Sequence, residues 1–553
     1  MSRAARSSAS ASEESEGSDD DDAEALARTR AEGARARETL DFLGGESKRA
    51  REEAFERAFG CVKRARASAD AVRALERLSL AFSMGSGGGG GGGGGARADA
   101  SGTRARTRRE TLDLGDDDMR ALDRANELAE RVVDDDASGG AGLELEVRRP
   151  RDATAWLLSR ALRGAFGGAS NLERLTSLTL RGGKGLSADG FGKLIGALRG
   201  DARALRRLDM SSCGLGADAG RALAEVLDEN GCPLERLDLR GNALGAEGAL
   251  ALSSALSRTK SLKSLNFAQN LIGADGVRAL AAALAGDTTL QELDLQHNGC
   301  GDSGCAALEM HGLGNLESLM LGFNGIGAKG AKSIAEALRK RHRSDEDDDM
   351  DAGEENMDED VVRASKMMKK LDLKCNVVGS EGAHALAEAL NDVEELDLSN
   401  NAVRDGAKWI SKALKSGAPN LKELNLQANE MTDDDAWWLA DALGSNTSLK
   451  TLNLGSNALG DSGASDIASD LRENTSLESL DLTRNAIGRD GATELMDAME
   501  ENKTLTRLGL ESNLIPAETT LEMKRRVGLR AQCDWQRAGF SDAAAASAPT
   551  KFT

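Results

Sequence analysis

The chain has 553 residues, a formal net charge of −21 at pH 7, no tyrosine and only 3% aromatic residues. Because this length exceeds one ordinary globular core, the chain must divide into domains or grow along one axis as a repeat array. The negative charge disfavours nonspecific binding to nucleic acid, and the few aromatic side chains leave little on which bases could stack. No run of about 18 apolar residues occurs, so no membrane-spanning segment is expected.

The segment before the repeats has parts of different composition. Residues 1–22 combine serine, alanine and acidic residues and are predicted to be disordered. Residues 23–84 place apolar side chains at the spacing of one or two amphipathic helices. They also contain two Lys-Arg-Ala-Arg stretches, which fit either a nuclear import signal or the solvated face of a helix. Residues 85–115 follow as a glycine-rich linker.

Residues 116–170 are predicted to form helices, the last of which covers residues 152–170 and carries Trp156 and Phe166. This helix lies directly before the first repeat. Because the first layer of a repeat array would otherwise expose its apolar edge, we expect the helix to act as an N-terminal cap.

Residues 172–515 repeat one pattern. Between Asn270 and Asn298, the alternating segment Leu290–Leu295 predicts a short strand with one buried face, and Val277–Leu284 has apolar residues at helical spacing. Equivalent positions recur every 25 to 30 residues, with one interval of 52. They are Gly183, Cys213, Asn242, Asn270, Asn298, Asn324, Asn376, Asn401, Asn429, Asn457, Asn485 and Asn513.

These twelve copies follow the pattern L-x-x-L-x-L-x-x-N/C-x-L, so the chain resembles leucine-rich-repeat proteins of the ribonuclease-inhibitor type. The Ran GTPase-activating protein and the repeat domains of NOD-like receptors are of this type. The resemblance implies an α/β solenoid, a right-handed horseshoe of about 12 repeats with a parallel sheet on its concave face and helices on its convex face. It says little about function, because many activities are built on this architecture.

Three sets of positions in the repeat are expected to serve the fold. The consensus leucines point into the stack, and the recurrent asparagine satisfies backbone groups that the stacking buries. The glycines six residues after the asparagine are expected to permit the turn into the helix. They are Gly248, Gly276, Gly304, Gly330, Gly382, Gly463 and Gly491.

The outward-facing strand positions are the candidate binding residues. The central one is Asp or Asn in most repeats, although both are depleted in strands, and arginines stand beside it near the N-terminal end. We therefore expect a concave groove for a protein or peptide with a basic or amide-rich surface. The candidates are Asp209, Arg236, Asp238, Arg240, Asn266, Asp294, Met320, Phe323, Asp372, Asp397, Asn425, Asn453 and Asp481.

Apolar residues at two places interrupt these polar surfaces. Met320 and Phe323 are either an anchor for the partner or a local cover beneath the insertion that follows them. Trp409 and Trp438 occupy the same helical slot of adjacent repeats. They are expected either to form a patch on the convex face or to shield each other.

The interval of 52 residues contains an insertion, 344–366, in which eleven of the residues 345–360 are acidic. Mutual repulsion predicts a disordered loop, which either tethers a basic partner or folds over the arginine-rich end of the groove. After the last repeat, residues 516–553 are expected to form a helical cap, predicted over residues 517–540, and a tail.

His297, Cys300, Cys305 and His311 lie within fifteen residues, as zinc ligands do. Both cysteines occupy slots that point inward in other repeats, so we expect core cysteines instead. No metal, cofactor or set of catalytic residues is predicted.

Two functions are compatible with these features. The first is a non-enzymatic scaffold that binds a protein on the concave face. The second is a GTPase-activating protein that resembles the Ran activator. In that family the acidic stretch follows the last repeat, whereas here it interrupts the array, and none of the family's catalytic residues can be matched to this chain. We expect a monomer. Residence in the cytoplasm or nucleus is expected because the seven cysteines are odd in number and widely spaced, as reduced thiols of an intracellular compartment are.

Overall fold

The computed structural model describes residues 108–113, 143–148, 175–182, 186–198, 204–228, 233–285, 289–343, 367–416 and 418–527. The chain divides into two compact units, and all described residues belong to the second. The predictions for residues 1–84, the cap helix at 152–170, the acidic insertion and the tail after residue 527 lie outside the described residues.

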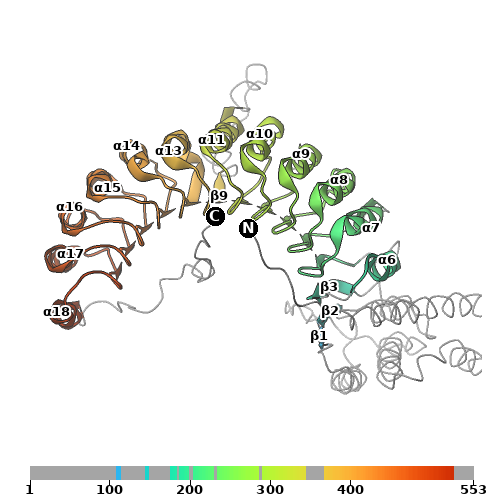
Figure 1. The fold of residues 1–553 in the computed structure, drawn as a ribbon, viewed down its shortest axis with the longest axis horizontal. Helices are drawn as coiled ribbons and strands as arrows, with labels where there is room; N and C mark the ends of the chain where they lie inside the picture. The colour runs from blue at the N-terminus through green and yellow to red at the C-terminus, as the bar shows by residue number, and fades with distance from the viewer. Residues whose placement is uncertain are drawn as a thin grey trace, which may run out of the picture. The chain divides into compact units, whose positions relative to one another are not determined.

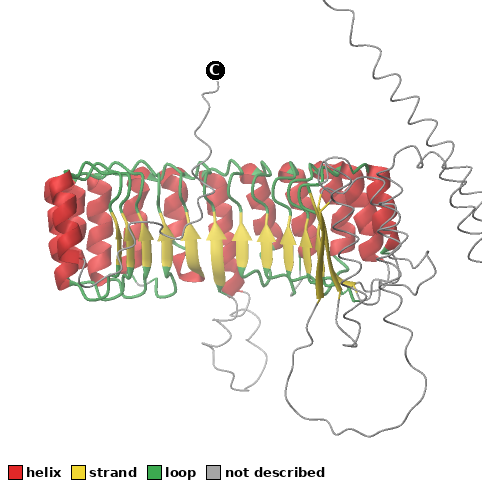
Figure 2. Ribbon diagram, turned by 90° about the horizontal axis from the view of Figure 1, so that it is seen from below, coloured by secondary structure: helices red, strands yellow, loops and turns green. Residues whose placement is uncertain are grey.

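The strands of the described residues form one parallel sheet in which they follow each other in sequence order (Figure 2). They are β1 (Arg108–Asp113), β2 (Leu143–Arg148), β3 (Leu175–Arg181), β4 (Arg207–Asp209), β5 (Arg236–Asp238), β6 (Ser264–Asn266), β7 (Glu292–Asp294), β8 (Ser318–Met320), β9 (Met368–Asp372), β10 (Val393–Asp397), β11 (Glu423–Asn425), β12 (Thr451–Asn453), β13 (Ser479–Asp481) and β14 (Arg507–Gly509).

A helix follows each strand from β3 onward, and the helices form a second layer on one side of the sheet (Figure 1). They are α6 (Ala188–Ala197), α7 (Gly216–Asp228), α8 (Gly245–Leu256), α9 (Gly273–Leu284), α10 (Gly301–His311), α11 (Ala328–Arg343), α13 (Gly379–Ala387), α14 (Ala407–Lys415), α15 (Asp433–Ser445), α16 (Asp461–Leu471), α17 (Arg489–Glu501) and α18 (Ala517–Val527), with short 3₁₀ turns at Leu390–Asp392 and Arg404–Gly406. Within this unit the strands line the concave side and the helices the convex side, which confirms the predicted fold class.

The core lies between the two layers. In β4, Arg207 is exposed and Leu208 is buried, and the other three-residue strands place their leucine in the core in the same way. One side chain per strand therefore joins the core, and its two neighbours face outward on the concave side.

The recurrent asparagine forms a continuous hydrogen-bonded ladder, as predicted. Asn270 Oδ1 accepts from the backbone N–H of Asn242 in the preceding repeat, at 3.1 Å. Its Nδ2 donates to the carbonyls of Leu239 and Phe267, each at 2.9 Å. Because each unpaired buried backbone group would cost roughly 1–3 kcal/mol, one asparagine per repeat stabilises the junction between two repeats.

The prediction for the glycines was wrong. Gly248 and Gly276 do not have positive φ; that conformation belongs to Gly245 and Gly273, three residues earlier. A Cβ on Gly276 would lie 2.6 Å from Cβ of Ile272 and 3.2 Å from Cβ of Ala249, in the preceding helix. These glycines are therefore required because successive turns and helices pack closely against them. The spacing of the glycines in the sequence does not show whether they serve close packing or a turn.

The sheet begins earlier than the sequence predicted. Strand β1 lies within the range predicted as a linker, and β2 lies within residues 116–170, which were predicted to be helical. The predicted linker at residues 85–115 and the predicted helices at residues 116–170 were therefore wrong at these two strands. The alternation of apolar and polar residues in Leu143-Glu-Leu-Glu-Val-Arg148 is typical of a strand. Strand β2 was missed because it lies further from the next repeat than the repeats lie from one another.

A helix also follows the last strand, as expected. Helix α18 packs its Met523 into the core, where this side chain is 2% exposed. Arg526 of α18 forms ion pairs with Asp497 and Glu500 of α17, at 2.8 and 2.7 Å. The array of described helices is thus closed at this end by α18.

Candidate functional site

The outward-facing side chains of the strands form one polar face, the concave face. In its central column, parallel register aligns Thr179, Asp209 and Asp238 on adjacent strands. The register continues through Asn266, Asp294, Met320, Asp372, Asp397, Asn425, Asn453, Asp481 and Gly509. The predicted candidates of this column are therefore neighbours in space. Glu146 of β2 extends the column beyond Thr179 and was missed because β2 was missed.

Asp and Asn recur in this column for a structural reason that the sequence did not reveal. Oδ1 of Asp294 accepts from the backbone N–H of Gln296 at 3.0 Å, and Oδ1 of Asp397 accepts from Ser399 at 2.9 Å. The same bond to the residue two positions on is made by Asp209, Asp238, Asn266, Asp372, Asn425, Asn453 and Asp481. Asp and Asn have the side-chain length for this turn, so one oxygen serves the fold. Each aspartate has a second oxygen, which at Asp209 and Asp372 is bonded within the chain.

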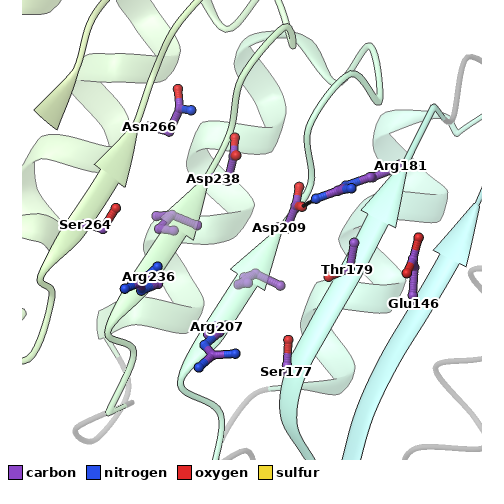
Figure 3. A pocket seen from close by; sticks show the side chains of 12 residues that line it. Glu146, Ser177, Thr179, Arg181, Arg207, Asp209, Arg236, Asp238, Ser264 and Asn266 are labelled. Carbon is purple, nitrogen blue, oxygen red and sulfur yellow. Dashed lines mark hydrogen bonds and ion pairs between the residues drawn. The ribbon is translucent and has the colours of Figure 1, made fainter. Parts of the chain in front are cut away.

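A hollow of about 360 Å³ lies over β2 to β6 (Figure 3). Arg181 donates from Nε and Nη2 to Asp209 Oδ2, at 2.9 and 2.5 Å. Arg236 and Asp238 project from the next strand into the same hollow. Burial, with a smaller contribution from the charge of Asp209, raises the pKa of Asp238 above its ordinary value. The hollow therefore offers both guanidinium and carboxylate groups to a ligand.

Arg240 belongs to a neighbouring column and does not line the hollow. Its Nε donates to Oε1 of Gln269 at 3.3 Å. It contributes positive charge to the face, since after burial its charge is the next cause that lowers the pKa of His297.

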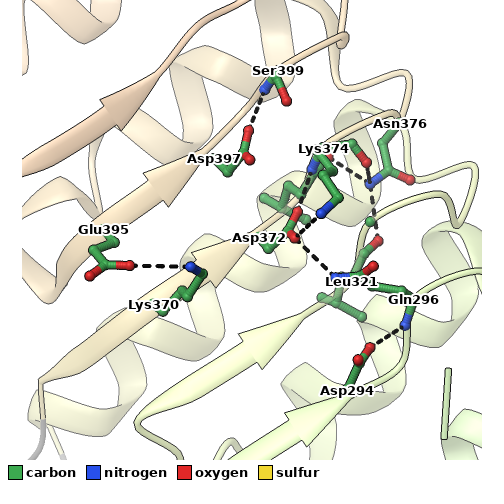
Figure 4. Close-up of polar contacts among 12 residues, drawn as sticks. Asp294, Gln296, Leu321, Lys370, Asp372, Lys374, Asn376, Glu395, Asp397 and Ser399 are labelled. Carbon is green, nitrogen blue, oxygen red and sulfur yellow. Dashed lines mark hydrogen bonds and ion pairs between the residues drawn. The ribbon is translucent and has the colours of Figure 1, made fainter. Parts of the chain in front are cut away.

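Carboxylates dominate the middle of the face (Figure 4). Asp372 is 3% exposed, and its Oδ2 accepts from Gln296 Nε2 and Lys374 Nζ, both at 3.0 Å. Burial raises the pKa of Asp397 and of Asp294, and the charge of Asp372 raises both further. The folded chain therefore holds mutually repelling carboxylates at this point, a charge arrangement that favours a cationic ligand.

Met320 and Phe323 lie in this region, between the carboxylates of Asp294 and Asp372. Both side chains are half-buried. The Phe323 ring stacks on His297, with ring centres 4.0 Å apart and planes at 13°. Burial, followed by the charges of Arg240 and Lys374, lowers the pKa of His297. His297 and Phe323 thus form a neutral aromatic spot in a charged surface. The sequence predicted Phe323 as a site residue but did not predict His297.

The C-terminal part of the column is less open. Asn425 and Asn453 are 5% and 1% exposed, so both amides are largely committed to the fold. Asp481 remains partly exposed, and its Oδ1 accepts from Thr483 at 2.8 Å. Binding contacts are therefore expected mainly between β3 and β10.

The tryptophans lie on the helical side of the repeats. Trp409 stacks on His384 with ring centres 3.8 Å apart, whereas Trp438 makes an edge contact with Trp437 at 4.8 Å. Among the described residues no ring contact joins Trp409 to Trp438. Trp437 and Trp438 are 48% and 42% exposed. Mutual shielding of Trp409 and Trp438 is therefore wrong, and an exposed pair lies on α15 alone.

The cysteines of the predicted zinc-like cluster are core residues, as expected. Cys300 and Cys305 are 2% and 0% exposed. A hydrogen bond with Cys300 and burial both raise the pKa of the Cys305 thiol. Within the described part of the chain, no three His, Cys, Asp or Glu side chains converge as metal ligands do. No described helix is both long and apolar enough to cross a bilayer.

Comparison with known families agrees with this geometry. A leucine-rich-repeat model matches residues 203–224, 232–253, 260–281, 286–308, 315–335 and 364–387. The leucine-rich domain of the tropomodulin and leiomodin type (TMOD/LMOD) matches residues 393–511. No curated protein sequence matches the chain.

Three solved structures are similar to this chain. A leucine-rich-repeat protein of Leptospira interrogans has 19% identity and a TM-score of 0.40, and the match covers 71% of this chain and 89% of that one. An internalin of Listeria monocytogenes has 19% identity and a TM-score of 0.38, with 64% and 80% covered. The yeast complex of Rad7 and Elc1 has 16% identity and a TM-score of 0.31, with 66% and 90% covered. The repeats matched in sequence and the observed sheet together identify the fold as a leucine-rich-repeat solenoid.

Proposed function

We propose that this chain is a non-enzymatic scaffold that binds one partner protein on the concave face. The observation that carries the proposal is the repeat containing β8. This repeat departs twice from the residue types used elsewhere, and both departures place an apolar group on the concave face.

The departure at Met320 is unfavourable for the fold. Met320 has no acceptor for the turn that Asp or Asn closes in nine other repeats. Phe323 has φ 60°, but the same left-handed conformation recurs at Gln269, His297 and Arg484, so only its large apolar side chain is particular to this repeat. The turn does not need Met320, and this supports a role of the repeat in partner binding.

The charges around this spot indicate the chemistry of the partner. Asp294 and Asp372 flank Met320 on the two adjacent strands, and Asp397 lies one strand further on. Burial raises the pKa of Asp294 and of Asp397. A partner with an apolar side chain flanked by Lys or Arg would fill the spot and neutralise the carboxylates.

The test compares binding by the full chain with two sets of substitutions. Met320→Asn with Phe323→Ser restores residue types found at these slots in other repeats, so the fold is retained. Asp238→Asn, Asp294→Asn and Asp397→Asn together remove three charges but keep every turn acceptor. Leu271→Ser with Val377→Ser is the matched control, because these side chains are 73% and 66% exposed in loops that follow the strands.

Partners captured by the wild-type chain and the control are expected to be lost or weakened roughly tenfold or more in both test sets, as hot-spot residues behave. Retention of the same partners by both test sets would show that the concave face is not the binding surface. Activation of a small GTPase remains an alternative prediction. It would be supported by faster GTP hydrolysis in the presence of the wild-type chain.

A further inference from the structure

A second surface, on the helical side, has the features of an interface. Trp437 and Trp438 are adjacent in α15 and lie 48% and 42% exposed. Tryptophan is usually buried at least in large part, and exposed pairs of this size are typical of contact sites between proteins. Three described tryptophans lie on two neighbouring helices, α14 and α15, which gives this stretch of the convex surface its aromatic character.

The two helices that flank α15 carry opposite charges. Helix α14, with the sequence AKWISKALK, contains Lys408, Lys412 and Lys415 and no acidic residue. Helix α16, with the sequence DSGASDIASDL, contains Asp461, Asp466 and Asp470 and no basic residue. Charge therefore changes sign across the exposed aromatic pair.

Among the described residues, Lys412 of α14 and Asp466 and Asp470 of α16 form no ion pair, whereas Lys408 pairs with Asp405 at 3.5 Å. Lys412 lies 5.8 Å from the centre of the Trp409 ring, and no carboxylate of the described residues forms an ion pair with it. Burial and the charges of Asp433 and Glu494 raise the pKa of Asp466. Burial and three other carboxylates raise the pKa of Asp470. By contrast, Lys415 already pairs with Asp441, and Asp461 accepts from the backbone of Gly488 at 2.7 Å.

We propose that α14, α15 and α16 form the contact of a homodimer, in which a two-fold axis passes through the Trp437–Trp438 pair. This inference concerns the convex face and does not depend on the function proposed for the concave face. A homodimer differs from the monomer that we expect from the sequence.

The symmetry follows from the order of the helices. Because α14 and α16 lie on opposite sides of α15, a two-fold axis that runs along α15 in the plane of the contact sets α14 of each copy against α16 of the other. The paired helices run parallel, because rotation about an axis along the helices keeps their direction. Lys412, the sixth residue of α14, then faces Asp466, the sixth residue of α16, and Lys415 in the last turn of α14 faces Asp470 in the last turn of α16. A surface that carries both charges around an aromatic centre is thus complementary to itself.

The available area predicts a weak dimer. Three helices spaced roughly 10 Å apart, the longest of about 20 Å, present roughly 600 Å² per copy. The pair would bury about 1,200 Å², the lower end of the range for specific interfaces. Two convex surfaces cannot extend the contact much further, so a dissociation constant in the micromolar range is expected.

The experiment is sedimentation velocity on the full chain over a concentration series at low and high salt. We expect a monomer–dimer equilibrium that weakens roughly tenfold when salt screens the charge pairs. Two charge-reversal variants then test the pairing: Lys412→Asp with Lys415→Asp, and Asp466→Lys with Asp470→Lys. Each variant alone is expected to be monomeric, because its two flanks have the same sign. An equimolar mixture of the two variants is expected to form a heterodimer, because each acidic α14 then faces a basic α16.

The mixing step separates loss of the interface from loss of folding, since misfolded variants would not recover association with each other. Lys329→Asp with Lys332→Asp is the matched control, because both lysines are exposed on the convex helix α11, outside the patch. Trp437→Ala with Trp438→Ala is expected to weaken the dimer at least tenfold. A wild-type chain that stays monomeric up to about 100 µM overturns the proposal. So does a dimer that tolerates the reversals, or a mixture that stays monomeric.

Discussion

Substitutions of Asp397 separate the two tasks of the central column. Its Oδ1 closes a turn by accepting from the backbone N–H of Ser399 at 2.9 Å. Its charge, in contrast, is unfavourable, because burial and the charge of Asp372 on the adjacent strand raise its pKa. The two substitutions Asp397→Asn and Asp397→Ala are therefore expected to change stability in opposite directions.

The structure gives the size of each effect. Asp397→Asn keeps the turn and removes a like-charge contact between neighbouring strands, which is worth roughly 0.2–1 kcal/mol. Asp397→Ala removes the same repulsion but leaves the Ser399 N–H without its acceptor, at a cost of roughly 1–3 kcal/mol. We expect the asparagine variant to be slightly more stable than the wild type and the alanine variant clearly less stable.

The dependence on pH follows from the direction of the pKa shift. Because the pKa of Asp397 is raised by folding, ionisation destabilises the folded chain as pH rises from the unfolded value, 3.8, through the folded value. The advantage of the asparagine variant is therefore present at neutral pH and disappears below pH 3.8.

Hydrogen exchange and denaturant unfolding measure both effects. In the alanine variant, the amide of Ser399 should exchange roughly tenfold faster or more, because each tenfold corresponds to about 1.4 kcal/mol. Equal stabilities of the two variants, or a destabilised asparagine variant at pH 7, would refute the division of roles in this column.

Three further predictions test the packing of the repeats. Gly276→Ala is expected to lower the free energy of unfolding by roughly 1–3 kcal/mol, because its Cβ would meet Cβ of Ile272 at 2.6 Å. The matched control Gly192→Ala, in the open helix α6, is expected to raise it by about 0.4–1 kcal/mol, and both are measured by denaturant unfolding. Asn298→Ala should cost at least about 2 kcal/mol by the same measurement, since it leaves the N–H of Asn270 and the carbonyls of Phe267 and Leu295 unpaired. Arg526→Gln should speed hydrogen exchange in α18 while exchange in α14 stays unchanged, because the ion pairs to Asp497 and Glu500 hold only the end of the array.

Residues that repeat at a fixed spacing were sufficient to predict the fold. The leucines of β4 to β14, and the asparagines that follow β5 to β14, take the same place in every repeat. One repeat of the pattern therefore specifies the strand, the core and the hydrogen-bonded ladder. Strand β2 was missed because its distance from β3 breaks that spacing, although its own alternation is regular. The spacing also identified the glycines such as Gly276 but not their purpose, which depends on the distance between neighbouring helices.

The candidate site was predicted in position but only partly in chemistry. The register brings Asp238, Asp294 and Asp397 into one column, as expected from their places in the repeat. The local turn that each closes could not be inferred, because an outward-facing aspartate has the same sequence position whether it binds a partner or its own backbone. Ring contacts such as His384 with Trp409 depend on the packing of adjacent helices and were likewise not predicted.

The choice between aspartate and asparagine in the central column also supports the proposed binding face. Asn266, Asn425 and Asn453 close the same turn as the aspartates do, so the fold needs the side-chain oxygen and not the charge. Asparagine at positions 238, 294 and 397 would therefore satisfy the turn without placing a buried charge there. The chain has aspartate at all three positions, where burial raises the pKa and disfavours ionisation. A charge that the turn does not need and that burial opposes supports the proposal of a cationic partner surface in the groove.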